Sequence, residues 1–146
     1  MKLYQKLRDW LKEGEFFLDI VRIYLGIGLF VKAIYFIYNQ ETLHGLVESA
    51  GEFWGITVLI SHYVILAHIA GGAMLALGLL TRIAAAVQIP ALLGAVFLVH
   101  FPNLLSEAGG DAEFELAALA LLLLLIFSIS GAGKLSVDAY LKTHDD

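Results

Sequence analysis

Long apolar runs occur four times along the chain, and short polar stretches separate them. The runs cover residues 15–38, 56–80, 83–101 and 113–130. A helix needs about 20 apolar residues to cross a hydrocarbon core of about 30 Å, and each run is close to that length. The pattern therefore predicts an all-α protein, an integral membrane four-helix bundle, formed as a single domain over residues 1–146.

Two further segments are amphipathic. In residues 1–13 apolar side chains recur at helical spacing, and basic side chains occupy the other positions. In residues 41–54 one helical face is apolar, and the opposite face carries Glu41 and Glu48. Helices of this kind lie in the membrane interface. We therefore expect interfacial helices at the N-terminus and in the first outer loop, with Trp54 at the depth of the lipid headgroups.

Residues that disfavour helices mark the ends of the apolar runs. Thr81-Arg82 predicts a tight turn between the second and third runs, and Pro102-Asn103 marks the loop after the third. Gly131-Ala132-Gly133 is expected to stop the fourth run and leave a polar tail. Within that tail, Ser136-x-Asp138 is expected to cap a short amphipathic helix over residues 137–141.

The basic residues are unevenly distributed. The chain has nine Lys and Arg residues, and none of them lies in residues 41–55 or 102–115. Loops rich in Lys and Arg stay on the cytoplasmic side of a membrane. Both termini and the turn at Arg82 are therefore expected to face the cytoplasm, in a multi-pass protein of the cell inner membrane.

Composition excludes several classes of function. A chain that is 60% hydrophobic and only 16% charged has too much apolar surface for a water-soluble domain, so the lipid bilayer is its expected partner. A net charge of −5 argues against nucleic-acid binding. Because there is no cysteine, the chain cannot form a disulfide or relay thiol electrons by itself. Any sulfur redox chemistry must therefore use a partner protein.

Ionisable side chains inside apolar runs are costly in hydrocarbon, so each of them needs a structural or functional role. Arg22 and Gln88 are expected at similar depth in the cytoplasmic half, close enough to hydrogen-bond, with Asp19 as the counter-charge. Together with Thr81 and Arg82 they form a candidate binding site for an anion or a quinone headgroup. The alternative is that Arg22 only fixes helix packing. The sequence assigns no catalytic residue.

A second polar pair is expected at the opposite end of the bundle. There Lys32 and Glu115 would form an ion pair that ties the first helix to the fourth, with a proton relay or substrate contact as the alternative. The histidines His62, His68 and His100 lack the carboxylate spacing of metal sites in helical bundles. We therefore predict no metal site and expect hydrogen-bonded packing histidines.

Three motifs follow one another in the order typical of a known family. Arg22 is followed by Gly26 in the first run, and the glycine-rich second run ends in Gly78-Leu79-Leu80-Thr81-Arg82. The fourth run is followed by Gly131-Ala132-Gly133 and then by Ser136-x-Asp138. In these motifs the chain resembles the DoxX family. It departs from the family at Lys32-Ala33, where members commonly carry His-Gly.

The resemblance implies a four-helix inner-membrane protein. In some members of the family this is the small subunit of a thiosulfate:quinone oxidoreductase or part of a membrane-associated oxidoreductase assembly. We therefore expect a small subunit or anchor of a membrane redox assembly, linked to quinone or sulfur compounds and encoding no redox centre of its own. The alternative is a non-enzymatic membrane scaffold or a small-molecule permease. A homo-oligomer or a place in a larger membrane complex is expected in either case.

Overall fold

The computed structural model describes residues 5–6, 14–48, 54–105 and 112–144. In these residues all the regular structure is helical, and no strand occurs. Four helical stretches are long and apolar enough to cross a membrane: Phe16–Tyr38, Ile56–Leu77, Thr81–His100 and Ala112–Ser130. The prediction of an all-α protein with four membrane-spanning helices is therefore confirmed.

The spans differ in how regular they are. The first and fourth are the single helices α2 (Glu15–Tyr38) and α8 (Ala112–Ser130). The second and third are each interrupted by a π-helix, in which the backbone hydrogen bonds reach one residue further. The second consists of α4 (Trp54–Leu66), η1 (Ala67–Gly71) and α5 (Gly72–Leu77). The third consists of α6 (Thr81–Gly94), η2 (Ala95–His100) and α7 (Phe101–Leu105).

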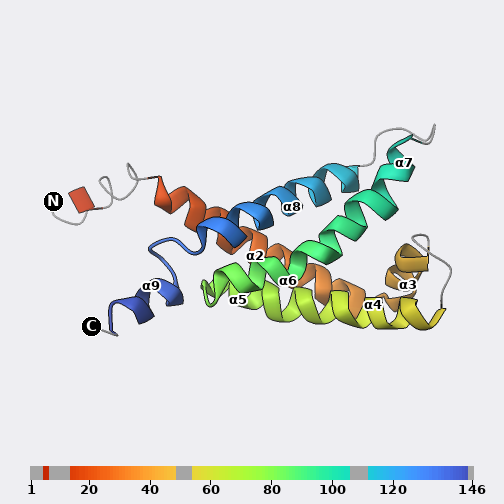
Figure 1. The fold of residues 1–146 in the computed structure, drawn as a ribbon, viewed down its shortest axis with the longest axis horizontal. Coiled ribbons are helices and arrows are strands. Elements are labelled where there is room, and N and C mark those ends of the chain that lie inside the picture. Colours follow the sequence, from red (N-terminus) through yellow and green to blue (C-terminus); the bar gives the residue numbers. More distant parts are fainter. Residues whose placement is uncertain (1–4, 7–13, 49–53, 106–111, 145–146) are drawn as a thin grey trace.

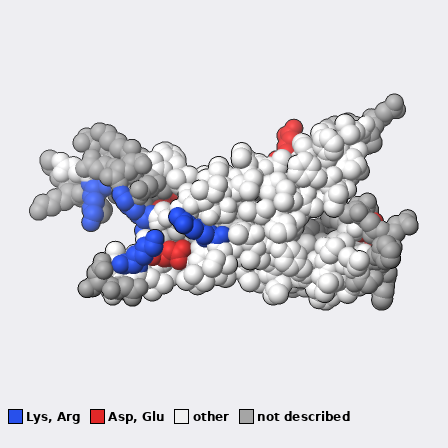
Figure 2. Space-filling view, in the orientation of Figure 1, with Lys and Arg blue, Asp and Glu red and all other residues white. Residues whose placement is uncertain are grey.

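The start of α2 and the C-terminal helix lie at the same end of the bundle (Figure 1). The short helix α9 (Val137–Lys142) lies at that end, and α3 (Gln40–Glu48) and α7 lie at the other. On the face shown in Figure 2, the visible Lys and Arg side chains gather at the end that holds the termini. An even number of spans explains why the chain returns to the side from which it started.

Helix packing is closest where glycines remove side chains from the interface. α2 packs mainly on α5 and η1, and α8 packs mainly on α6. A Cβ placed on Gly26 would lie 2.7 Å from the carbonyl oxygen of Gly72, and one on Gly72 would lie 2.8 Å from that of Gly26. The two backbones therefore touch directly, as small residues allow between membrane helices. Next to this crossing the interior is filled by residues such as Leu25 and Leu75.

The turn between the second and third spans lies earlier than predicted. Its residues are Gly78, Leu79 and Leu80, and Thr81 already begins α6. Gly78 and Leu80 both have left-handed backbone conformations, with φ of 70° and 45°. Two left-handed residues this close together reverse the chain direction within three residues. Arg82 therefore lies in the first turn of α6 and not in the connection between the two spans.

The predicted interfacial helices and the predicted loop at Pro102 had different outcomes. The interfacial helix expected over residues 1–13 lies outside the described residues, apart from Gln5 and Lys6. The second predicted interfacial helix is described only in part: residues 40–48 form α3, residues 49–53 lie outside the described residues, and Trp54 begins α4. Pro102 was predicted to lie in a loop, yet it lies in α7, which continues the third span directly after η2.

The end of the fourth span agrees with the sequence. α8 stops at Ser130, and Gly131 follows with φ of 76°. Ser136 then caps α9 by accepting a hydrogen bond at Oγ from the backbone N–H of Ala139, at 3.0 Å. The predicted helix stop and the predicted cap by Ser136 are both confirmed.

Candidate functional site

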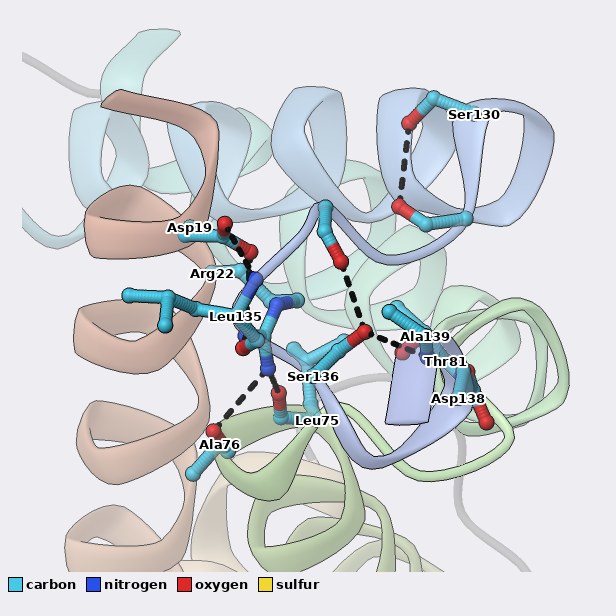
Figure 3. Close-up of polar contacts among 12 residues, drawn as sticks. Asp19, Arg22, Leu75, Ala76, Thr81, Ser130, Leu135, Ser136, Asp138 and Ala139 are labelled. Carbon is cyan, nitrogen blue, oxygen red and sulfur yellow. Dashed lines mark hydrogen bonds and ion pairs between the residues drawn. The ribbon is translucent and has the colours of Figure 1, made fainter. Parts of the chain in front are cut away.

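Arg22 is fully buried, and its guanidinium group joins three parts of the chain (Figure 3). Nη1 donates to the carbonyl oxygens of Leu75, at 2.5 Å, and Ala76, at 3.0 Å. Nη2 donates to the carbonyl oxygen of Leu135 at 2.6 Å and to Oδ1 of Asp19 at 3.2 Å. The last carbonyls of a helix have no partner within it and carry its partial negative charge, so the end of α5 is a suitable acceptor for a cation.

Asp19 completes this set of contacts from the preceding turn of α2. It is fully buried and forms the ion pair with Arg22 that the sequence predicted as a counter-charge. Its second oxygen, Oδ2, accepts a hydrogen bond from the backbone N–H of Leu135 at 2.9 Å. A Cβ on Gly133 would lie 2.5 Å from Oδ1 of Asp19. Only glycine therefore lets the C-terminal segment approach the carboxylate this closely.

Asp138 has a role that the sequence did not predict. Its two carboxylate oxygens accept hydrogen bonds from the backbone N–H groups of Leu80, at 2.8 Å, and Thr81, at 3.0 Å. Its own backbone N–H donates to the carbonyl oxygen of Gly78 at 3.0 Å. Ser136 alone caps α9, whereas Asp138 caps α6. The prediction that both residues cap the same short helix is therefore wrong for Asp138.

The electrostatics of this cap follow from its geometry. Partial burial alone would raise the pKa of the Asp138 carboxyl. The hydrogen bonds from the backbones of Thr81 and Leu80, together with the nearby charge of Lys142, outweigh that effect and hold the pKa below its ordinary value. A carboxylate at a helix N-terminus is further favoured by the partial positive charge there.

These contacts bring the three motifs of the sequence together. A Cβ on Gly78 would collide with Cβ of Ser136 and would lie 2.8 Å from Nη1 of Arg22. Glycine at this position therefore lets the turn, the first span and the C-terminal segment meet. We call the five residues Asp19, Arg22, Gly78, Ser136 and Asp138 the clasp.

The other candidate residues of this end are distributed differently. Gln88 does not hydrogen-bond to Arg22. It is fully buried, its Nε2 donates to the carbonyl oxygen of Ala84 at 3.3 Å, and it packs against Gly71. Thr81 is buried beside Asp138, and Arg82 is exposed. Binding of an anion or a quinone headgroup by this set stays a prediction.

Lys32 and Glu115 are both described and both exposed, and no ion pair joins them. The Lys32 ammonium lies over the rings of Tyr35 and Phe36, 5.8 and 5.3 Å from their centres. It also lines an open cavity of about 540 Å³ between α2, α3 and α8, which we call the α3 groove. The acidic residue in that lining is Glu113 rather than Glu115. The lining residues are Gly28, Val31, Lys32, Tyr35, Phe36, Thr42, Leu46 and Glu113.

The polar residues of the second span face two ways. Ser61 and His68 are buried. His62 is exposed, and its Nδ1 forms a hydrogen bond with the carbonyl oxygen of Val58 at 2.7 Å. Nδ1 of His68 has no hydrogen-bond partner of good geometry among the described residues, and neither has Oγ of Ser61. Among all the described residues, no three His, Asp or Glu side chains come close enough to hold a metal ion.

The helices and their apolar surfaces define a multi-pass membrane protein. Comparison with protein families then identifies which one: the model of the DoxX family matches residues 17–101, more than half of the chain. The chain therefore belongs to the DoxX family, as its motifs indicated. No curated protein and no solved structure matches it. The family match includes Arg22 and Thr81-Arg82, and the C-terminal motif lies beyond it.

The sequence did contain a signal for the missed role of Asp138. α6 begins directly after Leu80, which has no side-chain acceptor for the free N–H groups of the first turn. No residue at that position caps the helix, so an acceptor from elsewhere was required. Asp138 is a short acidic residue in a segment expected on the same side of the membrane, and it satisfies that requirement.

Proposed function

We propose that this protein is a small, non-catalytic subunit or anchor of a membrane redox assembly. In this role it embeds the assembly in the bilayer, and a partner protein carries the redox centre. The partner is needed because the chain encodes no cysteine and no redox motif. The family resemblance supports a link to quinone or to oxidised sulfur compounds.

The clasp is the observation that carries this proposal. Both terminal nitrogens of Arg22 donate to acceptors within the protein, only its Nε has no hydrogen-bond partner among the described residues, and both oxygens of Asp19 are engaged. A group that must bind and release a substrate needs free donors or acceptors in its resting state. The residues of the family motifs therefore support a rigid structural part better than a reactive site.

A quinone or an anion at this end would meet Arg82 before it meets Arg22. Arg82 is exposed in the first turn of α6, and its guanidinium lies beside Gly131, where a Cβ would be 3.1 Å from Nε. A planar guanidinium suits a carboxylate, a sulfur oxyanion or a quinone carbonyl. In the proposed assembly, Arg82 thus offers the contact to a headgroup, while the buried residues Thr81, Arg22 and Gln88 support it from inside.

The test is purification of the complex from native membranes in a mild detergent. We expect the chain alone to be colourless, and the complex to show the visible absorbance of a redox cofactor and to reduce a soluble quinone analogue with thiosulfate. The substitution Arg82→Gln should raise the KM for the quinone analogue or for thiosulfate. Lys142→Gln, at another exposed basic residue of the same end, is the matched control. If the chain purifies without any redox protein and its deletion leaves quinone reduction unchanged, the scaffold alternative holds.

One observation favours the permease alternative. Ser61, His68 and Gln88 each bury a polar atom without a hydrogen-bond partner among the described residues. Buried polar atoms of this kind are commonly satisfied by water, so they are compatible with a hydrated path between the second and third spans. Proteoliposomes should then pass a small polar solute such as glycerol faster than empty liposomes, and His68→Leu should abolish the difference. Equal rates would exclude this alternative.

A further inference from the structure

The α3 groove carries an inference that is independent of the proposed redox assembly. Its volume of about 540 Å³ lies in the range of cavities that bind small molecules, about 300–1,000 Å³. Its walls are mostly apolar, from residues such as Val31, Phe36 and Leu46, and it also contains one cationic group, the ammonium of Lys32. An amphiphile has the matching composition, with an apolar body and a single anionic group.

Lys32 lies near the end of its span, within reach of the lipid headgroups for a long side chain. Lys32 lies six residues before the end of α2 at Tyr38, which is about 9 Å along the helix axis. At this distance from the end of a span, a long Lys side chain can extend along the helix toward the headgroup layer. Among the described residues no carboxylate forms an ion pair with this ammonium, which lies over the two aromatic rings. A cation at the edge of hydrocarbon is strongly stabilised by an anion.

Gly28 provides room for an apolar chain below the charged group. It is exposed on α2, one turn from Lys32, and it lines the groove. A Cβ placed on it would meet no atom within 4 Å, so the space beside it is open. A lipid acyl chain lying against this part of α2 would fill that space without moving any protein group.

We propose that the α3 groove binds one phosphatidylethanolamine-type lipid, with its phosphodiester against the Lys32 ammonium and an acyl chain beside Gly28 and Val31. The carboxylate of Glu113 lines the same groove. It favours a headgroup that ends in a cation with N–H donors, and it disfavours a second negative charge. A headgroup with both charges is therefore complementary to the two charged residues of the groove.

The experiment is native mass spectrometry of the delipidated full chain, titrated separately with phosphatidylethanolamine, diacylglycerol and inorganic phosphate. We expect one saturable phosphatidylethanolamine, and binding of diacylglycerol that is at least about tenfold weaker because it lacks the phosphodiester. Inorganic phosphate should not bind measurably, because it lacks the acyl chain. If it binds as tightly as the lipid, the groove is a site for free anions and the proposal is wrong.

Substitutions locate the site. Lys32→Gln should weaken lipid binding at least about tenfold, and Lys32→Arg should restore most of it. Gly28→Leu should block the groove, whereas Gly94→Leu is the matched control, because a Cβ on Gly94 also meets no atom within 4 Å and Gly94 does not line the groove. Glu113→Gln should reduce the preference for phosphatidylethanolamine over phosphatidylglycerol.

Three results would overturn the proposal. The first is unchanged lipid binding in Lys32→Gln. The second is equal loss in Gly28→Leu and Gly94→Leu, which would indicate lipid distributed around the bundle rather than in the groove. The third is a dimer that depends on Lys32 and excludes lipid, which would assign the groove to a second copy of this chain.

Discussion

Arg22 and Lys32 lie on the same helix, α2, near opposite ends of the bundle, and their surroundings differ. Arg22 is fully buried, and its terminal nitrogens donate to three carbonyl oxygens and one carboxylate. Lys32 is exposed, lies over two aromatic rings and lines an open groove. A basic residue in a membrane helix therefore does not indicate a ligand site by itself. Whether its terminal nitrogens already donate to acceptors of the protein distinguishes the two cases.

The contrast extends to the glycines at each end. Gly78 and Gly133 lie so close to clasp residues that an added Cβ would collide with them, whereas Gly28 borders open space. At the clasp end the glycines allow chain segments to touch. At the groove end a glycine leaves a volume that the protein does not fill. Four measurements test whether the two ends of the bundle differ in this way.

The largest expected effect is all-or-none and concerns which side of the membrane each end faces. Cysteines introduced singly at Glu48 and Asn103 should react with an impermeant maleimide in intact cells, and a cysteine at Thr143 should not. The chain has no native cysteine, so no background labelling is expected. Labelling of Thr143 from outside would invert the topology and place the clasp on the outer side.

The second effect is a loss of stability on Arg22→Leu. The substitution leaves the Asp19 carboxylate buried without its counter-charge, and removal of one partner of a buried ion pair costs about 3–5 kcal/mol. Thermal unfolding in detergent, followed by circular dichroism, measures it. Lys32→Leu is the control at the other end and should change the unfolding temperature much less. Equal destabilisation by both substitutions would remove the distinction between the two ends.

The third effect compares two glycines. Gly78→Ala places a Cβ against Ser136 and Arg22 at a residue with φ of 70°, so we expect a loss of roughly 2–4 kcal/mol from strain and overpacking. Gly28→Ala adds the same methyl group in open space on α2, and it should be close to neutral. The same unfolding assay measures both. A neutral Gly78→Ala would mean that the turn and the C-terminal segment can separate without cost.

The smallest effect concerns Asp138. Asp138→Asn retains one acceptor but loses the charge at the start of α6, which is worth about 0.5–2 kcal/mol. Because the pKa of this carboxyl lies below its ordinary value of 3.8 in the folded protein, the unfolded chain binds more protons near that pH. The contribution is therefore fully present above about pH 4 and is lost as the pH falls through the folded-state pKa.

Unfolding measured between about pH 6 and pH 3 tests this sign. The stability difference between the unsubstituted protein and Asp138→Asn should shrink as the pH is lowered. A difference that stays constant over this range would mean that the charge of Asp138 does not contribute and that only the hydrogen bonds matter.

The fold was largely predictable from the sequence because span length and apolarity are local properties. The limits of α2, Glu15–Tyr38, agree with the first apolar run, and Gly131 marks the end of α8 as expected. The π-helices η1 and η2 had no equally local signal. They depend on how the second and third spans pack within the bundle.

The contacts of the candidate site were less predictable, because they depend on helix rotation and on distant segments. Glu113 and Glu115 lie at the same end of α8, but two residues turn a helix by about 200°, so only one of them lines the α3 groove. Gln88 was placed by depth next to Arg22, yet it packs against Gly71. Depth follows from counting residues, whereas the direction of a side chain follows from packing.

The position of Asp138 has a consequence for the order in which the protein is completed during synthesis. The start of α6 receives its cap, and Arg22 receives the carbonyl of Leu135, only from residues that leave the ribosome after the fourth span. The first three spans therefore enter the membrane with these polar groups still open. Chains interrupted between Ser130 and Leu135 should insert all four spans yet remain sensitive to proteolysis at the Gly78–Leu80 turn. Residues that follow the fourth span thus secure α2, which precedes the other three spans.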